Sequence, residues 1–131
     1  MKKNLDKILA EISAGELIDK ITILEIKKDK IKQVEKLLEV NKEFKSLIET
    51  FNKNISNNEE IKDLMSNLKE INLKLWDIED KKRLAERKNI FDDKFIQLAR
   101  DVYKFNDERA KIKLKINILL GSNIKEVKSY N

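Results

Sequence analysis

Four arginines stand out in a chain whose other basic residues are all lysine, because guanidinium groups bind carboxylates and phosphates with a fixed two-pronged geometry. They are Arg83, Arg87, Arg100 and Arg109. The sequence has no histidine and no cysteine, which removes the commonest general base, the thiol nucleophile and any thiolate zinc site. The Glu-x-x-His ligand pair of carboxylate-bridged metal bundles cannot be built either. The sequence therefore predicts neither a metal site nor a cofactor, and it assigns no catalytic residue.

Several charged or polar residues fall on helix faces that should be buried. At about 100° per residue, Arg109 points in the same direction as the apolar positions Leu98, Val102, Phe105 and Ile116. Asn106 lies at the edge of this face. Polar or amphipathic groups occupy comparable positions on two other predicted helices: Glu25, Trp76, Glu79 and Arg83. Since an unpaired buried charge is costly, these groups should meet, and we expect Arg109 to pair with Glu25 or Glu79.

The pattern supports two main interpretations. One is a structural ion-pair network that fixes the register of the helices in an assembly module. The other is a polar pocket between helices, where arginines hold a small anionic metabolite and carboxylates hold a hydroxyl or amine. A third interpretation is a metal-independent enzyme of the form seen in all-helical chorismate mutases, although their motifs are not present. The candidate ligand-binding residues are Glu25, Trp76, Glu79, Arg83, Arg100, Tyr103, Asn106 and Arg109.

The elements that must position these residues are helices. Ser13, followed by Glu16, has the spacing of a capping box and begins a helical pattern that runs to about residue 33. A second apolar run covers residues 34–51, and the sequence leaves open whether residues 14–51 form one helix or two. A polar loop at 52–58 precedes a third helix that fades near 87–90. Asp92 or Asp93 caps a fourth helix, which ends near Gly121.

We therefore predict an all-α fold, an antiparallel bundle of about four helices. It should form a single domain over residues 1–131, with its core at about 13–121. The first dozen residues could be extended, and the tail at 122–131 could pair with residues 8–12 as a strand. Because residues 13–28 carry apolar side chains on nearly all sides, and 44–51 add another stripe, we expect a homodimer or larger assembly.

The amino-acid composition indicates which kinds of binding partner the protein is expected to have. The net charge of +5 would suit nucleic acid, but the basic residues alternate with Asp and Glu instead of clustering. Heavy use of lysine, isoleucine and asparagine is typical of an AT-rich genome. We therefore expect weak nucleic-acid binding at most. No run of about 20 apolar residues and no secretory signal is present, so the sequence predicts a cytoplasmic protein without a membrane span.

Four blocks of the sequence resemble the signature of a family of small bacterial proteins that share a domain of unknown function. They are SAGELIDKITILEIKKDKI, LWDIEDKKR, FIQLARDVYKFNDERAKIKLKINILLGS and EVKSY. The resemblance covers roughly Ser13 to Tyr130 and implies no activity. It does imply that the following residues belong to the family pattern: Glu16, Asp19, Lys20, Glu25, Trp76, Asp77, Glu79, Asp80, Arg83, Arg100, Tyr103, Asn106, Asp107, Arg109 and Lys113.

Overall fold

Four helices make up 75% of the part of the chain that the computed structural model describes, residues 4–129. They are α1 (Ala14–Lys30), α2 (Val34–Asn54), α3 (Glu59–Lys88) and α4 (Asp93–Leu119). No strand occurs between residues 4 and 129, so the all-α prediction is confirmed. Tyr130, the last residue of the family blocks, lies outside the described residues, as do residues 1–3 and Asn131.

The helices begin and end where local side chains favour it. The N-caps of α1, α3 and α4 are Ser13, Asn58 and Asp92, and each side chain accepts a hydrogen bond from the backbone N–H three residues later, at 2.9–3.1 Å. α4 is followed by Gly121 at a φ of 63°, a left-handed conformation that glycine adopts readily. Residues 31–33 separate α1 from α2, so residues 14–51 form two helices.

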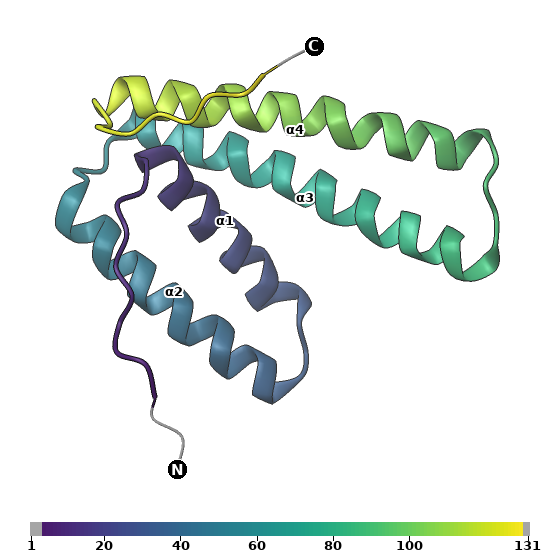
Figure 1. The fold of residues 1–131 in the computed structure, drawn as a ribbon, viewed down its shortest axis with the longest axis horizontal. Coiled ribbons are helices and arrows are strands. Elements are labelled where there is room, and N and C mark those ends of the chain that lie inside the picture. The colour runs from purple at the N-terminus through teal and green to yellow at the C-terminus, as the bar shows by residue number, and fades with distance from the viewer. Residues whose placement is uncertain (1–3, 130–131) are drawn as a thin grey trace.

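The helices form two antiparallel hairpins, α1–α2 and α3–α4, which cross near one end of the molecule (Figure 1). α1 packs closely against all three other helices, whereas α2 packs closely only against α1. This central position explains the apolar residues around nearly all of α1, of which Ile18, Ile21, Leu24 and Ile26 are buried. The stripe at residues 44–51 packs on the same core. Both features that suggested a dimer are therefore explained by contacts within one chain.

The α3–α4 hairpin extends well beyond the α1–α2 hairpin (Figure 1). We call its distal part, residues 84–103, the arm. Within the arm, the rings of Phe91 and Phe95 meet edge to face with their centroids 5.1 Å apart. Large apolar side chains are exposed along it: Leu84, Ile90, Phe91, Ile96 and Tyr103. The arm thus leaves apolar surface uncovered by the rest of the chain.

The terminal segments of the described chain form neither helix nor strand, and residues 4–12 are exposed. The tail runs back along α4 (Figure 1), and the Asn123 side-chain amide donates a hydrogen bond to Glu11 at 2.6 Å. The expected strand pairing of the tail with residues 8–12 is wrong, because neither residues 8–12 nor the described part of the tail, residues 122–129, forms a strand. Side chains hold the tail in place instead.

Candidate functional site

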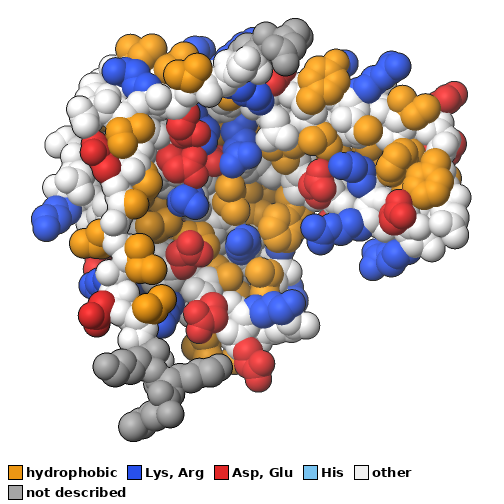
Figure 2. All heavy atoms as spheres, viewed as in Figure 1, with side chains coloured by type: hydrophobic (Ala, Val, Ile, Leu, Met, Phe, Trp, Pro, Cys, Tyr) orange, Lys and Arg blue, Asp and Glu red, His pale blue; other side chains and the backbone are white. Residues whose placement is uncertain are grey.

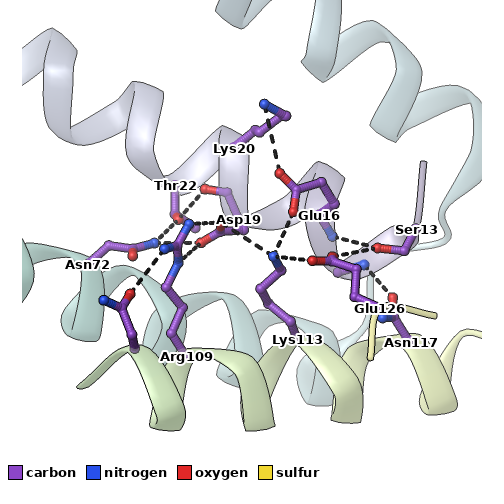
Figure 3. A network of polar contacts seen from close by, with 12 residues as sticks. Ser13, Glu16, Asp19, Lys20, Thr22, Asn72, Arg109, Lys113, Asn117 and Glu126 are labelled. Atoms are coloured by element: carbon purple, nitrogen blue, oxygen red, sulfur yellow. Dashed lines mark hydrogen bonds and ion pairs between the residues drawn. The ribbon is translucent and has the colours of Figure 1, made fainter. Parts of the chain in front are cut away.

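The centre of the candidate site is a buried carboxylate on α1, Asp19. Its side chain is fully buried and accepts hydrogen bonds on both oxygens (Figure 3). Arg109 of α4 donates from Nε to Oδ1 at 3.0 Å and from Nη2 to Oδ2. Asn72 of α3 donates to Oδ1 at 2.9 Å and to the Thr22 hydroxyl at 2.9 Å. The Asp19 carboxylate of α1 therefore joins three helices, through a bidentate ion pair with Arg109 of α4 and a hydrogen bond from the side-chain amide of Asn72 of α3.

The partner predicted for Arg109 from the sequence is wrong. Glu25 pairs with Lys69 of α3 at 3.8 Å, and Glu79 pairs with Lys82 on its own helix at 3.3 Å. Both carboxylates are more than one third exposed, whereas Asp19 faces α4 directly. The guanidinium therefore meets the carboxylate on the α1 face turned towards α4.

The network continues from Asp19 along α1 and α4 to the tail. Lys113 donates to Glu16 at 2.6 Å and to Glu126 at 3.1 Å, and its ammonium lies 3.9 Å from Asp19. The Ser13 hydroxyl donates to the other oxygen of Glu126 at 3.2 Å. Instead of closing a capping box onto Ser13, the Glu16 carboxylate is thus directed to α4 (Figure 3). One lysine links α1 to the tail through two carboxylates.

These contacts shift three pKa values. Burial alone would raise the pKa of Glu16, but the hydrogen bond and positive charge of Lys113 outweigh it and lower that pKa. Burial alone would lower the pKa of Lys113, but its bonds to Glu16 and Glu126 raise it. The hydrogen bond with Asp19 raises the pKa of Arg109 against the opposing effect of burial. All three residues are therefore held in their charged forms at neutral pH.

A glycine allows α1 to approach α4 closely beside this network. The Gly15 N–H donates to the Asn117 side-chain oxygen at 2.6 Å, and the Ala14 N–H donates to the Ser122 hydroxyl at 3.0 Å. A Cβ placed on Gly15 would lie 2.6 Å from the backbone oxygen of Lys113, too close for any side chain. Free N–H groups at the start of α1 are thereby satisfied by α4 and the tail.

The buried polar side chains find their hydrogen-bond partners within the protein. In residues 4–129, no buried side-chain nitrogen or oxygen lacks a hydrogen-bond partner. Ionic groups with this degree of internal pairing fix the relative positions of the helices that carry them. The Asp19 network therefore holds α1, α3 and α4 against one another, and Asn72 and Arg109 form its outer edge.

That outer edge opens into a cavity of about 370 Å³ between α1, α3 and α4, which we call the crook cavity. Five of the eight predicted site residues line it: Trp76, Glu79, Arg83, Asn106 and Arg109. Ile23, Ile26, Asn72, Leu75 and Asp80 complete the lining. Figure 2 shows this face hollowed between the α1–α2 hairpin and the arm, with hydrophobic side chains gathered in the hollow. Apolar walls and charged groups therefore meet in one open space.

The other three predicted residues lie outside the crook cavity. Glu25 faces Lys69, Arg100 is exposed on α4, and Tyr103 is 57% exposed on the arm. The structure does not bring them together with the other five. The arm, which extends beyond the α1–α2 hairpin, carries Arg100 and Tyr103 away from α1.

Sequence reasoning missed the residue at the centre of the site. Asp19 belongs to the family pattern implied by the resemblance, but it was not predicted as a site residue. A usable signal is the spacing of Gly15, Asp19, Thr22 and Ile26, which places all four on one face of α1. A glycine inside a helix often marks the close approach of another helix, so a carboxylate one turn later is a candidate for a buried pair.

The described residues were also compared with the requirements of a metal site and of a membrane-spanning helix. Residues 4–129 contain no cluster of three or more acidic side chains arranged to hold a metal ion. Over the same residues, every helix is too short or too polar to cross a lipid bilayer.

No curated protein and no solved structure matches the chain. A family of unknown function, DUF6165, matches residues 8–131, which include every residue of the crook cavity and the Asp19 network. This match confirms the expected membership in a family of unknown function. The chain belongs to the family of unknown function DUF6165.

Proposed function

We propose that the crook cavity binds a small metabolite that has an apolar body and an anionic group. The observation that carries this proposal is the lining of the cavity, in which an arginine, a tryptophan and two carboxylates from α3 face apolar side chains of α1. The volume of about 370 Å³ lies within the usual range for small-molecule sites.

Arg83 is the group best placed to hold the anion. Within residues 4–129 it has neither an ion pair nor a hydrogen bond to an acidic side chain, so its guanidinium is available to a ligand. Trp76, about two turns earlier on α3, offers a flat apolar wall. Asp80 is exposed and can accept a hydrogen bond from a hydroxyl or an amine of the ligand. The protein would thus recognise two groups of the ligand, its anionic group and a hydrogen-bond donor.

The Asp19 network would supply the rigid floor of this site. Arg109 and Asn72 line the cavity while Asp19 holds their polar ends. Side chains fixed in this way lose little further freedom when a ligand binds, which favours affinity. The structural network and the pocket, which the sequence presented as alternatives, are compatible in one site.

We also propose that the chain forms a homodimer through the arm. Two antiparallel helices cannot cover their own apolar faces, and five large apolar side chains are exposed between residues 84 and 103. Pairing the arms of two chains would give a four-helix arrangement that buries them. This assembly function does not depend on the ligand.

A metal-independent enzyme remains the alternative to simple binding. Glu79 and Asp80 lie in the same cavity as Arg83, a set of groups that could stabilise charge in a rearranging anionic substrate. Only the general form is shared with the helical chorismate mutases. We place the protein in the cytoplasm and expect no strong nucleic-acid binding.

The single tryptophan makes the binding proposal directly testable. Because Trp76 lines the crook cavity, a ligand that occupies it should change the tryptophan emission in a saturable way. A set of carboxylated and phosphorylated metabolites should contain compounds that do so at micromolar to millimolar concentration, as about −4 to −8 kcal/mol of binding free energy implies. A complete absence of saturable change across the set would count against the proposal.

A further inference from the structure

A second and larger cavity lies between the last turns of α4 and the tail. Its volume is about 680 Å³, and we call it the tail cavity. It touches the crook cavity only at Asn106 and Arg109, which line both. The rest of its lining comes from α4 residues 110–117 and tail residues 125–128. It is therefore a separate space, built by different residues from those of the crook cavity.

Basic residues outnumber acidic residues in the lining of the tail cavity. Five basic residues line it, and Glu126 is the one acidic residue among its lining side chains. Three of the five basic groups are already paired: Arg109 with Asp19, Lys113 with Glu16 and Glu126, and Lys128 with Asp107 at 2.9 Å. In the described chain, Lys111 on α4 and Lys125 on the tail have no such partner. Two uncompensated ammonium groups thus border one cavity from its two walls.

Apolar groups share the same space. Leu114 is 42% exposed and Val127 is 94% exposed, and both line the tail cavity together with Ala110. An occupant with an apolar body would remove these side chains from water. The cavity therefore combines two positive charges with an apolar surface that a ligand could cover.

We propose that the tail cavity binds a phosphate monoester with a small apolar body. A phosphate monoester carries a charge near −2 at neutral pH, because its second pKa is about 6. This charge matches two ammonium groups, whereas a carboxylate would leave one of them uncompensated. Lysine suits such a site because it binds phosphate as a flexible point charge. The apolar body would lie against Leu114 and Val127.

The test compares three probes that separate charge from shape: phenyl phosphate, benzoate and inorganic phosphate. Binding is followed by isothermal titration at pH 7.5 and by the NMR shifts of the Leu114 and Val127 methyl groups. Phenyl phosphate should bind at least about tenfold more tightly than either other probe, because only it offers both the double charge and the ring. Equal affinity for benzoate, or no binding of phenyl phosphate, would overturn the proposal.

Matched variants complete the test. Lys111→Ala combined with Lys125→Ala should weaken phenyl phosphate at least about tenfold. Lys36→Ala combined with Lys45→Ala removes the same charge from exposed positions on α2 and should leave the affinity within about twofold. An equal loss in both pairs would mean nonspecific attraction and contradict the site. Neither pair touches the crook cavity, so Trp76 emission reports failure of the binding proposed there separately.

Discussion

Arg109 and Asp19 lie 90 positions apart in the chain, yet the guanidinium of Arg109 contacts both carboxylate oxygens of Asp19. This contact fixes α4 against α1 at the position where Asn72 of α3 also donates to Asp19. Arg109 also lines both cavities. One ion pair therefore sets the helix positions on which both proposed binding sites depend.

Replacement of Arg109 by alanine should lower the free energy of unfolding by about 3–5 kcal/mol, because it leaves the fully buried Asp19 carboxylate without its principal partner. Urea denaturation followed by circular dichroism measures the change. Arg100→Ala serves as the control, since Arg100 is exposed and should change stability by no more than about 0.5 kcal/mol. A loss below about 1 kcal/mol for Arg109→Ala would show that the pair contributes little to the fold.

Gly15→Ala should destabilise the protein even though alanine is the better helix former by about 1 kcal/mol. The added Cβ would lie 2.6 Å from the Lys113 backbone oxygen, so α1 and α4 must move apart. We expect a net loss of about 1–3 kcal/mol in the free energy of unfolding. Ser66→Ala, at an exposed position on α3, should be nearly neutral in the same urea experiment. Unchanged or increased stability of Gly15→Ala would mean that the helices are not in close contact there.

Stability should fall on both sides of neutral pH through Glu16 and Lys113. The folded state lowers the pKa of Glu16 from its ordinary 4.5, so this contribution is present above pH 4.5 and is lost as the pH falls through the folded value. The folded state raises the pKa of Lys113 from 10.5, so that contribution is present below pH 10.5 and is lost as the pH rises through the folded value.

The acid side of this dependence is tested with Glu16→Gln. Between pH 5 and pH 3 the wild-type protein should lose more unfolding free energy than the variant, which has no carboxylate to protonate at this position. Urea midpoints measured every half pH unit give both slopes. Identical acid slopes for the two proteins would remove Glu16 from the explanation.

The proposed dimer predicts a light-scattering mass of two chains at micromolar concentration instead of the single-chain 15.5 kDa. Phe91→Lys combined with Ile96→Lys should return the protein to one chain, because both side chains are exposed on the arm and charge opposes their burial. Leu38→Lys, on the exposed side of α2, should leave the dimer intact. A wild-type mass of one chain would refute the assembly outright.

The helices could be predicted well from the sequence, because their signals are local. Ser13, Asp92 and Gly121 mark boundaries that the structure confirms. The break predicted at 52–58 is present but shorter, because α2 continues to Asn54 and residues 55–58 separate it from α3. The site was harder to predict, because the partner of Arg109 depends on how α1 and α4 cross. Helical periodicity gives the face on which Arg109 lies but not the residue of another helix that it meets. The projection of the arm beyond α1, which separates Tyr103 from the crook cavity, also has no local signature.

The central claim is that the crook cavity binds an anionic metabolite through Arg83, and the most direct test is the affinity of the best compound from the Trp76 emission screen in two arginine variants. Arg83→Ala should weaken binding at least about tenfold, since it removes the charged partner of the anion. Arg87→Ala removes the same charge one turn later on α3, outside the cavity, and should bind like the wild type. At 100 times its Kd the compound should also stabilise the wild type by about 2.7 kcal/mol, visible as a raised melting temperature. Equal affinities for wild type and Arg83→Ala would contradict the claim.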